Sequence, residues 1–220
     1  MVEVSTSLLS VKKEEIIATI YDLETAHTDY FHIDVMDGEF VKNNTARLML
    51  EYSEYIKQIS NIPLDIHLMV NDVKSYVTSY LGLNPNIITF HLEACKDKNE
   101  VMELIKYIKD NNCRVGIAIK PNTSLEEIYR FLPYIHMCLI MTVEPGKGGQ
   151  KLIPSTIEKI KELKTYVMEN NLEIDIEADG GINVDNIEEV AGAGINIVVV
   201  GSGILNSDNY SEYMKNLKKT

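Results

Sequence analysis

The sequence predicts a closed barrel of eight parallel β-strands with a helix after each strand. Eight apolar, strand-like runs alternate with amphipathic helical stretches over the whole of its 220 residues. The repeat is about 25 residues long, which is typical of the (β/α)8, or TIM, barrel. An open sheet that binds a dinucleotide would carry GxGxxG after its first strand. The sequence there is SVKKEE, so we favour the closed barrel over an open, doubly wound sheet.

The strands and helices are expected at regular intervals along the chain. The strand-like runs lie at residues 2–9, 30–36, 64–69, 86–92, 114–119, 137–142, 173–178 and 195–200. The clearest helical stretches, with apolar residues spaced three and four apart, lie at 12–26, 46–60, 100–112, 155–171 and 184–194. Ser124 and Asp185 are expected to begin helices, and Gly194 is expected to end one. We expect residues 1–220 to form a single barrel domain.

The charge balance excludes several kinds of partner. Asp and Glu number 33 against 21 Lys and Arg, and the net charge is −12. Such an acidic protein is not expected to bind nucleic acid or an anionic membrane. No apolar run is long enough to cross a membrane, and no signal peptide is apparent. Three cysteines without a CxxC spacing predict reduced thiols and a cytoplasmic protein.

Polar residues interrupt the strand-like runs near their C-terminal ends, where the chemistry of such barrels is found. The second run carries His32 and Asp34 on one face, the third carries His67, and Asp179 ends the seventh. Each alone has an ordinary explanation, as a hydrogen-bonded core histidine or an aspartate in a turn. Together at one rim they are harder to explain, because burying unpaired carboxylates is costly. A divalent cation satisfies all four, and Zn²⁺, Fe²⁺, Mn²⁺ and Co²⁺ all suit these ligands.

Other side chains share these strands without a role that the residues themselves define. His91 and Glu93 follow one another on one face at the end of the fourth run. Met36 and Met69 lie on the same strand faces as the candidate ligands, and Met141 lies near the end of the sixth run. Methionines at such positions ordinarily fill irregular space in a core.

Glycine-rich segments follow the last three runs. They read EPGKGGQ after the sixth, DGGI after the seventh and VGSGI after the eighth. Loops of this kind after strands seven and eight form the usual phosphate site of a barrel, through backbone N–H groups. Such a site needs no lysine, so an acidic protein can bind a phosphorylated substrate. The alternative is that these glycines only make tight turns.

The sequence resembles the ribulose-phosphate 3-epimerase family over nearly the whole chain. The matching segments are STSLLS, HIDVMDGEFVKN, DIHLMV, FHLEA, MTVEPGKGGQ, IEADGGI and VGSGI. The succession HxDxMDG, HLM, PGxGGQ and DGG is highly specific. The resemblance implies a barrel of the ribulose-phosphate-binding type.

The resemblance also implies roles for individual residues. His32, Asp34, His67 and Asp179 match the family's metal ligands, and both aspartates match its acid/base residues. The residues that match substrate-binding positions are Ser7, Met36, His67, Met69, Met141, Gly146, Lys147, Gly148, Gly149, Gly180, Gly181, Gly201 and Ser202.

The implied reaction is the epimerisation of a ketose phosphate at carbon 3, which converts D-ribulose 5-phosphate to D-xylulose 5-phosphate. A proton next to the carbonyl leaves from one face of carbon 3 and another arrives on the opposite face, so two carboxylates are needed. One divalent ion, Zn²⁺ before Fe²⁺, Mn²⁺ or Co²⁺, stabilises the enediolate between these steps. The resemblance further implies a place in the pentose phosphate pathway and a homo-oligomer, either a dimer or a hexamer.

Two positions depart from the family pattern. Lys42 stands where the family usually has the proline of FVPN, and Lys147 where it has the phenylalanine of PGFGGQ. Lys147 lies in the loop after the sixth run, the expected lid, and either reaches the substrate or points into solvent. These changes bear on which sugar phosphate is preferred, and D-allulose 6-phosphate is the alternative substrate. Gly181 modestly favours the pentulose, because epimerases for the hexulose often lack this glycine.

Two other classes of protein fit the sequence less well. Related barrels that decarboxylate their substrates need a lysine in an Asp-x-Lys-x-x-Asp arrangement, and HIDVMDG has none. A barrel that only binds a sugar phosphate would not need two acid/base aspartates together with two histidines.

Overall fold

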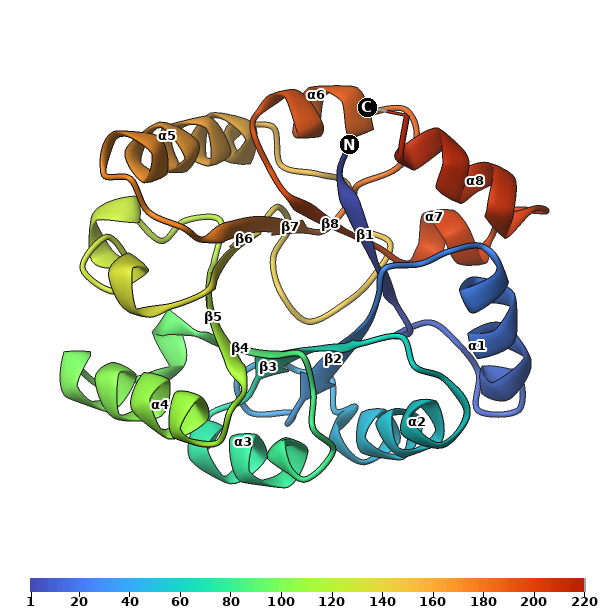
Figure 1. Cartoon of the computed structure of the whole chain (residues 1–220), viewed down its shortest axis with the longest axis horizontal. Coiled ribbons are helices and arrows are strands. Elements are labelled where there is room, and N and C mark those ends of the chain that lie inside the picture. Colours follow the sequence, from blue (N-terminus) through green and yellow to red (C-terminus); the bar gives the residue numbers. More distant parts are fainter. Residues whose placement is uncertain (220) are drawn as a thin grey trace.

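The computed structural model describes residues 1–219 and shows a closed barrel of parallel strands in the order β1 to β8 (Figure 1). The strands are β1 (Glu3–Ser7), β2 (Tyr30–Met36), β3 (Leu64–Met69), β4 (Ile87–His91), β5 (Arg114–Ile119), β6 (Met137–Met141), β7 (Asp175–Asp179) and β8 (Ile197–Val200). β1 pairs with both β2 and β8, which closes the barrel. The predicted (β/α)8 fold is confirmed, and the runs predicted at 30–36, 64–69 and 114–119 coincide with β2, β3 and β5.

The helices surround the barrel on its outer side (Figure 1). They are α1 (Ile16–Thr25), α2 (Ala46–Ile59), α3 (Val73–Leu81), α4 (Lys98–Asp110), α5 (Ser155–Glu169), α6 (Ile187–Gly192), α7 (Ser202–Leu205) and α8 (Tyr210–Leu217). Each of the five predicted helical stretches contains one of them, in whole or in its greater part. Within residues 1–219, no helix is long and apolar enough to cross a membrane.

Ser124 does begin a helix between β5 and β6, as predicted, but the helix is a short 3-10 helix and not an α-helix. Two 3-10 helices occupy this segment instead, η2 (Leu125–Glu127) and η3 (Leu132–Tyr134). Pro133 lies in the first turn of η3. A proline lacks the N–H group and clashes with the preceding turn of an α-helix, so one long helix cannot run through this position. The segment still buries Leu125 and Leu132 against the main hydrophobic core.

The turns around α6 agree with the prediction in one place and not in the other. α6 begins at Ile187, and Asn186 rather than Asp185 occupies its N-cap position. The Asp185 amide instead donates to Asn183 Oδ1 at 2.9 Å, in the turn before the helix. Gly194 lies just beyond the helix with a φ of 101°. This left-handed conformation favours glycine, as expected for the residue that ends a helix.

Alternate residues of each strand point into the barrel and form layers across it. In the register of β2 and β3, His32 lies beside Asp65 and Asp34 lies beside His67. Ile33, between the two polar residues of β2, belongs to the hydrophobic cluster that packs against the helices. The interior is therefore polar where the site lies. Its buried polar residues include Ser5, His32, Asp34, Asp65, His67, Thr89, His91 and Glu177.

The interior is tightly packed at the contact of β4 with β5, and this predicts the effect of a small substitution. A Cβ atom on Gly116 would lie 2.3 Å from Thr89 Oγ1 and 3.1–3.2 Å from the other Thr89 side-chain carbons. Rotating the β-branched Thr89 therefore cannot make room. We expect Gly116→Ala to lower the free energy of unfolding by about 1–3 kcal/mol, as overpacked cores do, in urea denaturation.

Gly192→Ala is the matched control. No atom lies within 4 Å of a Cβ built on Gly192, at the end of α6. The control should be neutral or stabilising by up to about 1 kcal/mol, because alanine favours helices over glycine. Equal stability of the Gly116→Ala protein and the wild type would show that the interior relaxes around the added methyl group.

Candidate active site

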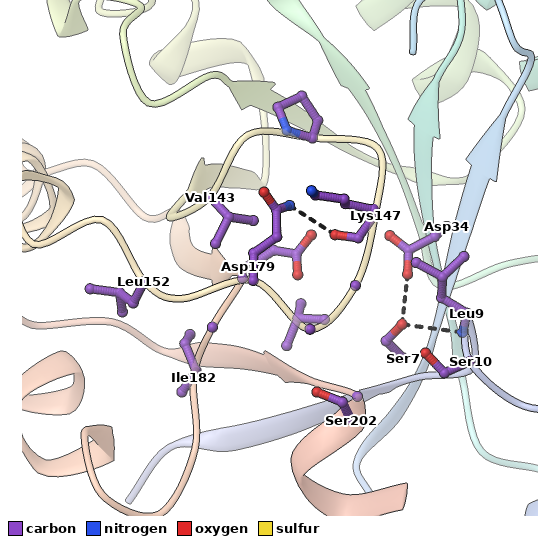
Figure 2. A pocket seen from close by; sticks show the side chains of 18 of the residues that line it. Ser7, Leu9, Ser10, Asp34, Val143, Lys147, Leu152, Asp179, Ile182 and Ser202 are labelled. Carbon is purple, nitrogen blue, oxygen red and sulfur yellow. Dashed lines mark hydrogen bonds between the residues drawn. The ribbon is translucent and has the colours of Figure 1, made fainter. Parts of the chain in front are cut away.

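A cavity of about 740 Å³ opens at the C-terminal ends of the strands. The loops after β1, β6, β7 and β8 form its walls (Figure 2). The sequence-predicted residues that line it are Ser7, Asp34, Met36, Met69, Met141, Gly146, Lys147, Gly148, Gly149, Asp179, Gly180, Gly181, Gly201 and Ser202. His32 and His67 are not part of its lining, because both are fully buried beneath its floor.

Four of the predicted residues meet at the floor of the cavity. Asp34 Oδ1 lies 3.4 Å from both His32 Nε2 and His67 Nδ1. Asp179 Oδ2 lies 3.6 Å from His67 Nδ1 and 4.0 Å from His32 Nε2. One donor atom from each of the four residues falls within 4.8 Å of all the others, so together they could hold a metal ion.

The hydrogen bonding of this cluster tests whether a metal ion fits it. His32 Nε2 and His67 Nδ1 are buried and have no hydrogen-bond partner within residues 1–219. Ser7 Oγ donates to Asp34 Oδ2 at 2.7 Å, which leaves Oδ1 facing the two histidines (Figure 2). Two orphaned imidazole nitrogens beside two carboxylate oxygens are a donor set that suits a divalent transition metal. The residues present therefore fit such an ion.

The surroundings push the pKa values of the two aspartates apart. Burial acts to raise the pKa of Asp34, but His32 and His67 outweigh it and hold this pKa well below its ordinary value. Burial and the charge of Asp34 raise the pKa of Asp179 to about 7. The floor of the cavity thus combines a carboxylate that stays ionised with one that is close to protonation at neutral pH.

A third carboxylate, that of Asp65, contacts the ring nitrogen of His32 that faces away from Asp34 and Asp179. Asp65 Oδ2 lies 2.6 Å from His32 Nδ1 and also accepts a hydrogen bond of 2.7 Å from Ser5 Oγ. Burial acts to lower the pKa of His32, but Asp65 and Asp34 together raise it well above its ordinary value. A cation bound at Nε2 would therefore replace a proton of this ring.

His67 is held from behind by a different arrangement. Its Nε2 lies 3.0 Å from His91 Nε2, and His91 Nδ1 lies 3.1 Å from Glu93 Oε2. Burial lowers the pKa of His67, and it lowers the pKa of His91 to about 4. Burial acts to raise the pKa of Glu93, but hydrogen bonds from His91 and its other neighbours hold it at about 2.

The glycines after β7 make close backbone contacts at the cavity wall. Gly180 and Gly181 have φ angles of 122° and 69°, which favour glycine. A Cβ on Gly180 would lie 2.3 Å from a Val143 side-chain carbon, and one on Gly181 would lie 2.3 Å from the Leu152 backbone nitrogen. These glycines therefore do make tight turns, and they also expose backbone at the cavity.

The loop between β6 and α5 crosses the mouth of the cavity. The side-chain amide of Gln150 donates to the carbonyls of Glu144 and Lys147 at 2.7 and 2.9 Å. Asn43 Nδ2 donates to the Gly146 carbonyl at 2.7 Å, which joins this loop to the one after β2. Lys147 lines the cavity, whereas Lys42 is exposed and lies outside its lining.

Comparison with known proteins decides the family. The family model described as "Ribulose-phosphate 3 epimerase family" matches residues 3–205. The chain belongs to the ribulose-phosphate 3-epimerase family. It is therefore an enzyme and an epimerase, as the resemblance implied.

Curated relatives agree with this assignment. A ribulose-phosphate 3-epimerase from Buchnera aphidicola is 38% identical over 94% of this chain and 90% of its own length. One from Methanocaldococcus jannaschii is 34% identical over 100% of this chain and 91% of its own. One from Escherichia coli is 34% identical over 88% of this chain and 84% of its own.

Solved structures share the barrel at much lower sequence identity. A 3-keto-L-gulonate-6-phosphate decarboxylase from Vibrio cholerae superposes with a TM-score of 0.75 at 11% identity, covering 99% of this chain and 96% of its own. A 3-hexulose-6-phosphate synthase from Salmonella typhimurium gives 0.68 at 16% identity, covering 98% and 96%. At such identities the similarity concerns the fold alone.

The epimerase contains supporting residues to which the sequence analysis gave no role. Asp65 lies two residues before His67 in LDIHLMV, and Glu177 lies two residues before Asp179 in IEADGG. Both are buried in the barrel interior. Their spacing of two was a usable signal, because a carboxylate on the same strand face as a ligand must also point into the barrel.

Proposed function

We propose that the chain epimerises D-ribulose 5-phosphate and D-xylulose 5-phosphate at carbon 3, with one divalent metal ion as its cofactor. The observation that carries this proposal is the pair of buried, unpartnered nitrogens, His32 Nε2 and His67 Nδ1, which face the carboxylates of Asp34 and Asp179. The names of the relatives support the pentulose substrate. Zn²⁺ is the first candidate ion, because histidine nitrogens and carboxylate oxygens are ligands that it commonly takes in proteins.

In this mechanism the two aspartates move the proton at carbon 3. Asp34 comes from β2 and Asp179 from β7, so their carboxylates approach the cavity from strands that are not neighbours. One removes the proton, the other protonates the opposite face, and the roles exchange when the reaction runs backwards. A bound divalent ion supplies positive charge that stabilises the enediolate between the two steps. Ser7 keeps Asp34 in place through its hydrogen bond of 2.7 Å.

The remaining lining residues position the sugar phosphate. Met36, Met69 and Met141 are 1–2% exposed and border the cavity beside the aspartates. Their thioethers can lie close to a planar intermediate without giving it a proton. Backbone N–H groups of Gly180, Gly181, Gly201 and Ser202 would bind the phosphate, and the loop containing Gly146, Lys147, Gly148 and Gly149 would cover the sugar.

The proposal extends to the setting of the enzyme. We place it in the pentose phosphate pathway and in the cytoplasm, in line with its free cysteines Cys95, Cys113 and Cys138. We propose a homo-oligomer, a dimer or a hexamer, as the resemblance implies. The whole chain would act as one catalytic domain.

Solvent exchange at carbon 3 tests the reaction directly. D-Ribulose 5-phosphate and D-allulose 6-phosphate are offered separately in deuterium oxide, with chelator-treated and metal-restored protein, and NMR follows deuterium at carbon 3. We expect fast exchange and epimer formation with the pentulose, lost on chelation and regained with metal. Exchange chiefly with the hexulose would make D-allulose 6-phosphate the substrate. Absence of exchange with both, despite bound metal, would mean that the loops containing Lys42 and Lys147 have redirected the barrel to another substrate, whereas a barrel that only binds a sugar phosphate need not hold a stoichiometric metal ion.

The two-base mechanism predicts the effect of removing either carboxylate. Asp34→Asn and Asp179→Asn should each lower turnover to well under a tenth of the wild-type rate, because an amide cannot exchange a proton with carbon 3. Metal content is measured on the same samples, since each aspartate is also a proposed ligand. A variant that holds metal and keeps more than a tenth of the wild-type rate would disprove the two-base assignment.

Lys147 at the cavity predicts a change in substrate affinity. Its side chain has no ion-pair partner within residues 1–219, so it could meet an anionic substrate at the cavity. Lys147→Ala should raise KM for the pentulose phosphate by roughly twofold to fivefold with a smaller effect on kcat, as expected for an exposed ion pair. Lys42→Ala, which removes an exposed lysine outside the cavity, is the control. Equal KM values for the two variants would place the Lys147 ammonium in solvent.

A further inference from the structure

The segment FHLEA has no part in the proposed reaction, yet two of its side chains lie directly behind a candidate metal ligand. His91 is fully buried, and its two ring nitrogens contact His67 Nε2 at 3.0 Å and Glu93 Oε2 at 3.1 Å. We propose that Glu93, acting through His91, is a positioning residue that fixes the tautomer in which His67 presents its Nδ1 lone pair to the metal ion. This inference rests on the proposed metal site.

The positions of the protons follow from the contacts. A neutral imidazole carries one N–H and one lone pair. For Nδ1 of His67 to bind a cation, the proton of this ring must be on Nε2. That N–H points at His91 Nε2, which must then be the acceptor, because two N–H groups cannot face each other at 3.0 Å. The proton of His91 is therefore on Nδ1, where it is donated to Glu93 Oε2.

The orientation of Glu93 is determined by other donors. Its Oε1 accepts a hydrogen bond of 2.7 Å from the Lys120 amide and another from the Thr123 hydroxyl. Oε2 is thus the oxygen left for His91. Because the Lys120 amide can only donate, the atom at the Oε1 position must be an acceptor. The peptide after β5 therefore specifies which way this side chain faces.

The two histidine rings in this chain of contacts are shielded from solvent, and Glu93, whose side chain is 21% exposed, lies at its outer end. His67 and His91 are both fully buried, and their ring centroids lie 5.1 Å apart. The Phe40 ring lies over His91 at 4.9 Å between centroids, and Lys120 Nζ lies 4.2 Å from the centre of the Phe40 ring. In a site closed in this way the carboxylate is the natural acceptor for the His91 proton, and it transmits its preference to His67.

The other candidate histidine ligand, His32, is also anchored to a carboxylate, but without an intervening ring. His32 faces the cavity with Nε2, and its Nδ1 contacts the Asp65 carboxylate directly at 2.6 Å. His67 faces the cavity with the opposite nitrogen, Nδ1, and its Nε2 is anchored to a carboxylate through one further ring. A histidine ligand whose second nitrogen is bonded to a carboxylate is the common arrangement in metal proteins. Glu93 therefore supports His67 through His91 in the way that Asp65 supports His32 directly.

Glu93→Gln reverses the order of the protons while conserving size. The glutamine must place its carbonyl oxygen toward the Lys120 amide and its NH₂ group toward His91. His91 Nδ1 then becomes an acceptor, His91 Nε2 a donor, and His67 is left with its proton on Nδ1, the atom needed by the metal. We expect the dissociation constant for Zn²⁺ or Co²⁺, measured by chelator competition, to rise about 10- to 100-fold. Glu127→Gln, the same change at an exposed residue of the next loop, should leave it unchanged.

Nitrogen-15 NMR of the metal-free protein shows directly which ring nitrogen of each histidine carries the proton, in the wild type as well as in the variant. In the wild type we expect His67 protonated at Nε2 and His91 at Nδ1, and in Glu93→Gln the reverse for both. Thermal unfolding of the metal-free variant checks that it folds. A wild-type His67 protonated at Nδ1, or a folded Glu93→Gln protein that binds metal as tightly as the wild type, would overturn the inference.

Failure of the proposed function can be distinguished from failure of the positioning role of Glu93. A wild-type protein that neither binds one metal ion nor exchanges the carbon 3 proton overturns the metal-dependent epimerase and the positioning role with it. A wild-type protein that does both, beside a Glu93→Gln protein of unchanged metal affinity, overturns the positioning role alone.

Discussion

The burial of charged groups inside a closed barrel is the constraint on which the structure depends. Every second strand residue must point into an interior that water does not fill, and an unpaired charge there is costly. At the candidate site, Asp34 and Asp65 therefore have donors of their own. Ser7 donates a hydrogen bond to Asp34, and Asp65 accepts one from Ser5 and lies within hydrogen-bonding distance of His32. Within residues 1–219, two imidazole nitrogens of this cluster have no hydrogen-bond partner and lie beside the carboxylates of Asp34 and Asp179, so the four residues could hold a metal ion.

The carboxylates of the barrel differ in whether they face the cavity or support a residue that does. Asp34 and Asp179 lie at its floor, whereas Asp65 lies one layer deeper and bonds to His32. Burial acts to raise the pKa of Asp65, but His32 outweighs it and lowers it. For Glu177, burial and the charge of Asp65 outweigh the opposing charge of His32, so its pKa is raised well above the ordinary value. Burial and the charge of Asp65 thus favour the neutral form of Glu177.

The sequence allowed prediction where local pattern alone determines structure. The alternation in YFHIDVMDG placed His32 and Asp34 on one face, and the structure agrees because β2 keeps this period without a bulge. In the segment after β5, the start of a helix at Ser124 was predicted, but the local pattern did not show that this helix is a short 3-10 helix. The contact of Asp65 with His32 spans 33 positions of sequence and depends on strand register, which no local pattern reports. The different environments of Lys42 and Lys147 likewise depend on how two loops meet.

The alternation of β2 also limits how this protein can change. Inward His32 and Asp34 are interleaved with outward Ile33 and Val35, so the candidate site and the hydrophobic core share the same short strand. Shifting the strand by one position would turn the ligands toward the helices and bring aliphatic side chains to the cavity. Substitutions can therefore alter the chemistry one group at a time, whereas an insertion or deletion in this strand removes activity and stability together. We therefore expect changes of chain length in the loops and changes of chemistry at the inward positions of the strands.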